Sequence, residues 1–234
     1  MQAVDRQCDI PIELIRFAHT LKCFTQSVAR KDPVKIVAIG SSSTKGEGAS
    51  MPSATYPARL EAELRLRFAG LSIDVINKGV GGEEAPEEAA RLQKDVIAEK
   101  PTLVVWQVGT NAVWKNYDLD EVVAAIEGGL SCLASTKSDI ALMDLQYAPA
   151  LLAANRKPSA ERMVDLIGDV ANKAGINVFR RFALMRHWSI DDRIPFDQMI
   201  SNLDANQLHQ NDWSYNCVAQ ALADAIADAT GRLV

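Results

Sequence analysis

Short apolar segments alternate with longer helical patterns along most of the chain. Five segments are rich in Val, Ile and Leu without polar alternation, as strands buried on both faces are. They are Val34–Gly40, Ile73–Ile76, Leu103–Val108, Ile140–Leu145 and, most weakly, Ile176–Phe179. Helical patterns lie near Tyr56–Phe68, Pro86–Ala98, Leu119–Ala134, Ala160–Ala174 and Trp213–Ala229, the last with Asp212 as its expected N-cap. Such repeated β–α units predict a parallel sheet with helices on both faces.

The first 33 residues follow a different pattern. Apolar side chains recur at spacings of three and four, which predicts one amphipathic helix; they are Leu14, Phe17, Leu21, Phe24 and Val28. We therefore expect an N-terminal helical extension, residues 1–33, followed by an α/β domain, residues 34–234. The helix is expected to pack on that domain. A subunit interface, giving a homo-oligomer, is the alternative.

Composition and charge exclude several classes of protein. No apolar run approaches the ~18 residues of a membrane span. The net charge of −5 provides no basic surface for nucleic acid. The first apolar stretch, Ile10–Phe17, is interrupted by Glu13 and Arg16, so it is not the core of a signal peptide. The sequence as given predicts a cytoplasmic protein, or a periplasmic or secreted one if it is a trimmed form.

The four cysteines carry no recognisable motif. Cys8, Cys23, Cys132 and Cys217 are widely separated and form no CxxC pair. This spacing gives no indication of a zinc or redox site. We expect four free thiols, of which those in helical segments behave as small apolar side chains.

Polar loops follow the first three predicted strands. Ligands of open parallel sheets bind outside the carboxyl ends of the strands, so these loops are expected to form one site. They are Gly40–Gly46, Asn77–Gly82 and Gly109–Asn111. Two phosphate-binding motifs do not fit these loops. A Walker loop needs Lys and then Ser or Thr after its second glycine, but Gly46 is followed by Glu47. In the dinucleotide-binding motif GxGxxG, Glu84 occupies the position of the third glycine.

The same loops suit acyl transfer, which needs a hydroxyl nucleophile, a base and N–H donors for an oxyanion. The first loop offers serines, Gly82 an unobstructed backbone N–H, and Asn111 a side-chain amide. The base must come from only three histidines. His19 precedes the first strand and is expected to be structural, and His187 is expected to serve packing or the surface. His209, in the loop before the last helix, is the expected base.

These blocks, in this order, resemble the SGNH hydrolase superfamily of GDSL-type lipases and esterases, from about Val34 to Ala229. Gly40–Gly46 resembles the GDSxTxG block and implies Ser42 as nucleophile. Asn77–Gly82 resembles the second block and implies the N–H of Gly82 as an oxyanion donor. Gly109–Asn111 resembles the GxND block and implies the amide of Asn111 as another, together with the N–H of Ser42. Asn206-Gln207-Leu208-His209 resembles the DxxH block and implies His209 as base, oriented from position 206. The resemblance also implies a three-layer flavodoxin-like fold with strand order 2-1-3-4-5.

Three positions depart from the superfamily pattern. Ser41 replaces the aspartate of the GDS block, Ala112 that of the GxND block and Asn206 that of the DxxH block. The form GSSSTxG, with later QVGTN and LHxNDWSY, resembles a bacterial branch in which the first replacement is normal. Asn206 can accept a hydrogen bond from the imidazole but supplies no negative charge. Asp204 as a substitute carboxylate, or a Ser–His dyad oriented by a backbone carbonyl, are the alternatives.

The sequence thus predicts a serine esterase that hydrolyses short, acetyl-like esters of a carbohydrate or small metabolite through an acyl-enzyme. No metal or organic cofactor is implied. Five aromatic residues are candidates to stack on a sugar, although packing is the simpler role of each: Trp106, Trp114, Tyr117, Tyr147 and Trp188. The alternatives are a weak or inactive protein that binds acylated glycans or a protein partner, and a lysophospholipase or thioesterase for longer acyl chains.

Overall fold

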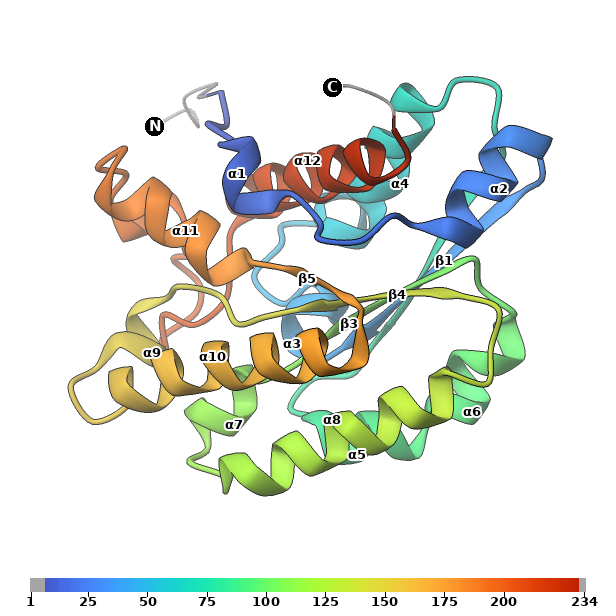
Figure 1. Cartoon of the computed structure of the whole chain (residues 1–234). Helices are drawn as coiled ribbons and strands as arrows, with labels where there is room; N and C mark the ends of the chain where they lie inside the picture. The colour runs from blue at the N-terminus through green and yellow to red at the C-terminus, as the bar shows by residue number, and fades with distance from the viewer. Residues whose placement is uncertain (1–6, 232–234) are drawn as a thin grey trace.

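A five-stranded parallel sheet lies between two layers of helices in the computed structural model, which describes residues 7–231 (Figure 1). The strands are β1 (Val34–Gly40), β2 (Ile73–Gly79), β3 (Leu103–Gln107), β4 (Asp139–Met143) and β5 (Asn177–Phe179). They are ordered β2-β1-β3-β4-β5, with every neighbouring pair parallel. This confirms the three-layer α/β fold and the strand order implied by the resemblance.

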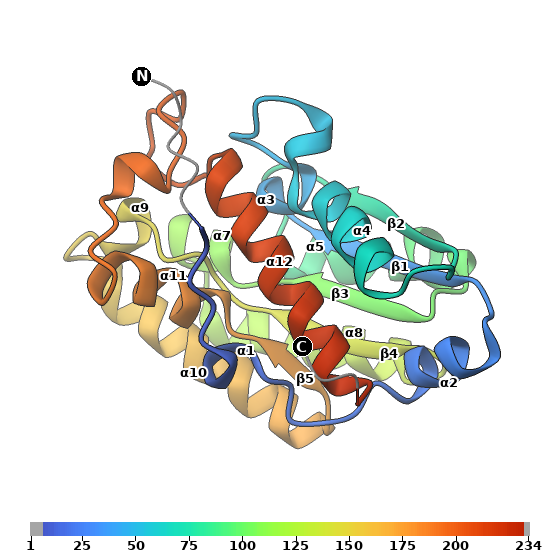
Figure 2. The ribbon, with the colours of Figure 1, turned by 90° about the horizontal axis from the view of Figure 1, so that it is seen from above.

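Side chains of β1 alternate between two hydrophobic clusters, one on each face of the sheet. Ile36 belongs to the cluster beneath α4 (Tyr56–Arg67) and α12 (Asp212–Ala229), whereas Val37 belongs to the opposite cluster. Figures 1 and 2 show α4 and α12 together on one face. The opposite face carries α5 (Ala85–Ala90), α6 (Leu92–Asp95), α8 (Leu119–Leu133) and α10 (Lys157–Ala174). No helix within residues 7–231 has both the length and the hydropathy of a membrane span.

Short helices and turns complete the connections between these elements. They are α3 (Ser42–Lys45), α7 (Thr110–Trp114), α9 (Pro149–Leu152), α11 (Arg181–Ile190) and the 3₁₀ turns η1 (Pro52–Ala54), η2 (Ile97–Glu99) and η3 (Phe196–Gln198). The helix expected over Pro86–Ala98 is divided among α5, α6 and η2. The N-cap of α12 is Asn211, whose Oδ1 accepts from the N–H of Ser214 at 3.0 Å. Asp212 was the wrong choice, because its carboxylate instead accepts from the N–H of Ser50 at 2.8 Å.

The single N-terminal helix predicted from the apolar stripe is wrong. Two helices form, α1 (Ile12–Ile15) and α2 (Lys22–Arg30). Between them, the side chain of Asn177 in β5 accepts from the N–H of His19 at 2.8 Å and donates to its carbonyl at 3.0 Å. Because these tertiary hydrogen bonds engage the main chain, the helix cannot continue. Phe17 and Phe24 are nevertheless buried in the cluster beneath α12, so the segment packs on the sheet. The subunit interface stays a prediction.

A disulfide joins Cys8 to Cys217, so the expectation of four free thiols is wrong for this pair. Their Cα atoms are 5.4 Å apart although 209 residues separate them in the chain. Sequence spacing alone cannot reveal such a contact. The bond attaches the N-terminal segment to α12, while Cys23 and Cys132 are free.

We expect Cys217→Ser to lower the free energy of unfolding by about 2–4 kcal/mol, because the cross-link restricts the unfolded chain. Urea unfolding without reductant measures this loss. Cys132→Ser, which removes an exposed free thiol, is the matched control and should unfold near the wild-type midpoint. Equal midpoints for wild type and Cys217→Ser would show that the cross-link does not form.

Candidate active site

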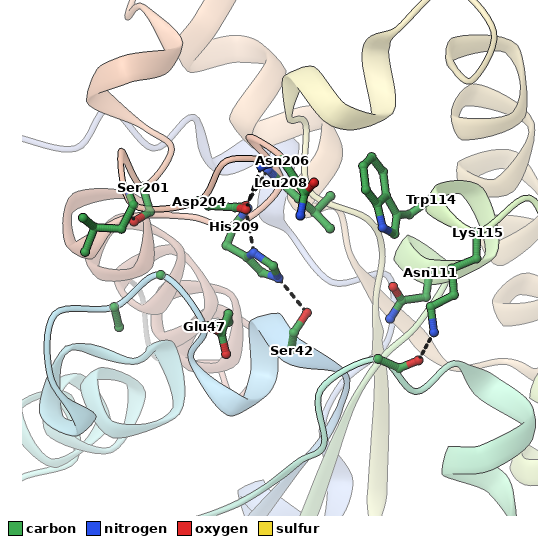
Figure 3. Close-up of a pocket in the computed structure, with 14 residues that line it drawn as sticks. Ser42, Glu47, Asn111, Trp114, Lys115, Ser201, Asp204, Asn206, Leu208 and His209 are labelled. Atoms are coloured by element: carbon green, nitrogen blue, oxygen red, sulfur yellow. Dashed lines mark hydrogen bonds and ion pairs between the residues drawn. The ribbon is translucent and has the colours of Figure 1, made fainter.

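The predicted loops meet at the carboxyl edge of the sheet, around an open cavity of about 510 Å³ (Figure 3). The loops after β1, β2 and β3 each contribute to its wall, and the segment before α12 closes one side. Its lining includes Ser42, Glu47, Gly82, Asn111, Trp114, Lys115, Ser201, Asp204, Asn206 and His209. Each residue predicted for the site therefore lines one cavity.

Ser42 begins α3, and its Oγ lies 2.9 Å from Nε2 of His209. The neighbouring serines face away from the cavity. The Oγ atoms of Ser41 and Ser43 both donate to Oε1 of Gln107, each at 3.0 Å. Of the three consecutive serines, Ser42 alone presents its hydroxyl to a base.

The imidazole of His209 is oriented by Asp204. Oδ2 of Asp204 lies 2.8 Å from Nδ1 of His209 and also accepts the backbone N–H groups of Leu208 and His209. Asn206 meets this carboxylate only through its backbone N–H, which donates to Oδ1 at 3.0 Å. The placement of Asn206 as the orienting residue is therefore wrong, and the geometry matches the Asp204 alternative. A turn at Gln207, with φ of 54°, directs the chain so that the earlier residue reaches the ring.

The surroundings of Asp204 favour its ionised form. Burial alone raises the pKa of this carboxyl, but the backbone N–H groups of His209, Leu208 and Asn206 and the charge of His209 outweigh burial and lower it. Asp204 therefore stays a carboxylate and can stabilise an imidazolium. Ser42, His209 and Asp204 together have the geometry of a nucleophile, a general base and an orienting acid.

Asn111 lies across the cavity from His209 (Figure 3), and Gly82 lines the same cavity. Nδ2 of Asn111 donates to the carbonyl of Glu83 at 2.7 Å, which leaves its second hydrogen for a ligand. Gly82 has a φ of 84°, in the left-handed region that favours glycine. Its carbonyl accepts from Nζ of Lys115 at 2.5 Å. Both potential oxyanion donors are thus held by hydrogen bonds between neighbouring loops.

Glu84 joins the loop after β2 to α7, a role that the sequence reasoning missed. Its buried carboxylate accepts the N–H groups of Gly109 at 2.7 Å and Ala112 at 2.8 Å. Burial raises the pKa of this carboxyl, while the bonded N–H groups oppose the rise. The feature of the sequence that could have revealed Glu84 is its spacing from Glu87, since the two residues form a capping box at the start of α5. Glu84 thereby fixes the position of Asn111.

Arg181 and Gln146 form a second buried connection beneath the cavity. The guanidinium of Arg181 donates to Oγ of Ser43 at 3.0 Å and to Oε1 of Gln146 at 2.8 Å. Gln146 also accepts from Oγ1 of Thr110 and donates to the carbonyl of Leu208. The nucleophile turn, α7 and the His209 loop are therefore linked. No sequence signal distinguishes Arg181 from its neighbouring arginine.

The other two histidines lie outside the cavity, as expected. Nδ1 of His187 bonds Asp191 at 2.9 Å, and Nε2 bonds Asp9 at 3.0 Å. Burial lowers the pKa of His187, but these hydrogen bonds and the charges of Asp191 and Asp192 raise it overall. Within residues 7–231, Asp9, His187 and Asp192 are the one group whose ligand atoms lie close enough to hold a metal ion. The raised pKa favours the protonated imidazole, whose charge is complementary to the three surrounding carboxylates.

Known proteins with similar sequences and structures include several esterases. An acetylxylan esterase from Geobacillus stearothermophilus is 28% identical over 187 residues, covering 72% of this chain and 80% of the relative. The crystal structure of a two-domain esterase active on acetylated mannans superimposes with a TM-score of 0.78 at 18% identity. That match covers 95% of this chain but only 58% of the two-domain protein.

Two further structures match over most of both chains. A catalytic mutant of an acetylxylan esterase from Geobacillus stearothermophilus has a TM-score of 0.69 at 21% identity, covering 84% of this chain and 96% of the other. An α/β hydrolase from the metagenome of Lake Arreo, Spain, has a TM-score of 0.68 at 24% identity, with 87% and 99% covered. The Non-GDSL lipase-like family matches residues 7–232. The chain therefore belongs to the Non-GDSL lipase-like family.

Proposed function

We propose that this protein is a serine esterase that removes short acyl groups, chiefly acetyl, from a carbohydrate. The observation that carries the proposal is the chain of hydrogen bonds from Ser42 through His209 to Asp204, at 2.9 and 2.8 Å, on the wall of an open cavity. The acetyl esterases among its sequence and structural relatives support the same reaction. We also assign the chain to the SGNH branch with a GSSSTxG first block.

The reaction proceeds through an acyl-enzyme. His209 Nε2 accepts the proton of Ser42 as Oγ attacks the ester carbonyl, while Nδ1–H donates to Asp204. The resulting oxyanion is stabilised by the N–H groups of Ser42 and Gly82 and by the amide of Asn111. His209 then gives its proton to the departing alcohol. Water, deprotonated by His209, attacks the acyl-enzyme and releases the carboxylic acid and Ser42.

The geometry argues against both alternatives from the sequence. The inactive binding protein was suggested mainly by the neutral Asn206, but Asp204 supplies the carboxylate instead. A long acyl chain needs an apolar channel, whereas charged and polar side chains line much of this cavity, among them Glu47, Lys115 and Ser201. A short acyl group suits such surroundings better.

The disulfide bears on the compartment. Disulfides persist in oxidising compartments and are rare in a reducing cytosol. The Cys8–Cys217 bond therefore favours the periplasmic or secreted alternative over the cytoplasmic one.

A series of p-nitrophenyl esters from acetate to laurate tests the proposed function. We expect kcat/KM to be highest for acetate, and Ser42→Ala to abolish turnover because the nucleophile is lost. A fluorophosphonate should label wild type at Ser42, located by peptide mass spectrometry. Absence of both labelling and hydrolysis in the intact protein would leave the binding protein as the better explanation. A maximum at long chains would favour the lysophospholipase or thioesterase.

We expect Asp204→Ala to lower kcat for p-nitrophenyl acetate by about 10⁴-fold, because the imidazole loses both its orientation and its counter-charge. Steady-state kinetics measures the change. Asp197→Ala, at an exposed carboxylate of the same segment, is the control and should retain activity. Asn206→Asp should not compensate for the loss in Asp204→Ala, since residue 206 does not contact the ring. Recovery in that double variant would contradict the assignment.

Asn111→Ala should lower kcat by about 10²–10³-fold, because an oxyanion donor acts mainly in the transition state. KM for p-nitrophenyl acetate should change little. The same kinetic measurement separates the two parameters. A large rise in KM at unchanged kcat would instead assign Asn111 to ground-state binding.

A further inference from the structure

Trp114 forms part of the cavity wall at the end of α7, three residues after Asn111 (Figure 3). The guanidinium of Arg156 stacks on its indole ring, 4.3 Å from the centroid. This cation–π contact holds the ring in place from one side. The partly exposed indole therefore offers the cavity a flat, preoriented apolar surface.

Asn206 lies between His209 and Trp114 at the mouth of the cavity (Figure 3). Its side-chain amide has no hydrogen-bond partner within residues 7–231 and is exposed, since Asp204 orients the imidazole in its place. A carboxamide offers two donors and an acceptor, which suits sugar hydroxyl groups. Because Asn206 does not orient His209, its side chain is available to bind a ligand.

The size of the cavity points to a ligand larger than an acetyl group. A volume of about 510 Å³ falls within the range of pockets that hold whole small molecules. A pyranose ring has apolar C–H faces and a polar hydroxyl edge. An indole surface with an amide beside it matches both features.

The direction of proton transfer places the sugar on the side of the cavity where His209 lies. His209 Nε2 must donate to the oxygen of the departing alcohol, so the alcohol part of the ester lies next to His209. Asn206 is on the same loop and Trp114 is across the mouth from it (Figure 3). We propose that Trp114 and Asn206 form a subsite for the pyranose ring that carries the acetyl group. This inference rests on the proposed esterase function.

The test compares an acetylated sugar with an acetyl ester that has no sugar. The measured quantity is kcat/KM for acetylated xylotriose divided by kcat/KM for p-nitrophenyl acetate. Trp114→Leu, which keeps an apolar side chain on α7, should lower this ratio about tenfold, as expected for loss of an aromatic contact. Trp114→Phe, which keeps an aromatic ring, should retain most of the wild-type ratio. Tyr117→Ala removes an exposed aromatic residue that does not line the cavity and is the matched control.

Asn206→Ala provides an independent variant on an exposed loop, should Trp114→Leu fail to fold. We expect it to lower the ratio severalfold. Calorimetry with xylotriose adds a measurement without turnover: Ser42→Ala should bind this trisaccharide, and Ser42→Ala/Trp114→Leu should bind it about tenfold more weakly.

The outcomes separate this subsite from the esterase function itself. A wild-type protein that hydrolyses neither substrate would contradict the proposed function. Hydrolysis of both, with the ratio and the xylotriose affinity unaffected by Trp114→Leu and Asn206→Ala, would overturn the subsite alone. A change in preference among p-nitrophenyl acyl lengths at an unchanged ratio would place Trp114 on the acyl side and also overturn it.

Discussion

The arrangement of the candidate site depends on the buried guanidinium of Arg181. A cation removed from water is tolerated only when its donors are satisfied. Those of Arg181 reach Ser43, Gln146 and the carbonyl of Asp144. Burial outweighs the hydrogen bond from the N–H of Phe182 and the positive charge of Arg181, and it raises the pKa of the Asp144 carboxyl to about 7. Because these donors connect the turn that holds Ser42 with Gln146, which in turn bonds the carbonyl of Leu208, they restrict how Ser42 and His209 can lie.

A second buried polar centre performs a similar role on the Asn111 side of the cavity. The Glu84 carboxylate accepts N–H groups from α5 and α7, while Glu88 accepts from Nε1 of Trp106 at 2.7 Å. Burial and the nearby charge of Glu84 raise the pKa of Glu88 well above its ordinary value. We infer that Glu88 is neutral and Glu84 ionised, since two adjacent buried carboxylates cannot both carry charge easily. The proposed oxyanion donors Gly82 and Asn111 are thus held by two loops that the Glu84 carboxylate joins.

Local sequence patterns predicted the features that local interactions determine. The apolar runs predicted all five strands, most clearly β1 and β3, because strands buried on both faces need apolar side chains on both. Polar loops at strand ends likewise located Gly82 and Asn111, whereas Ser42 was singled out by the resemblance to the SGNH blocks and His209 by its place before the last helix. The disulfide between Cys8 and Cys217 and the interruption at His19 depend on partners distant in the chain, which no local pattern records. Arg181 was missed for the same reason.

The misplaced orienting residue has a more specific cause. The superfamily block sets the carboxylate three positions before the histidine, whereas this loop uses Asp204, five positions before His209. With this longer span, Oδ2 of Asp204 accepts hydrogen bonds from Nδ1 of His209 and from the backbone N–H groups of Leu208 and His209. One carboxylate oxygen therefore fixes both the conformation of the loop and the orientation of the imidazole. Residue 206 is then free of the catalytic geometry and exposed at the cavity mouth. In the proposed enzyme, residue 206 can therefore change without disturbing the imidazole of His209, which a carboxylate three positions before the histidine would not permit.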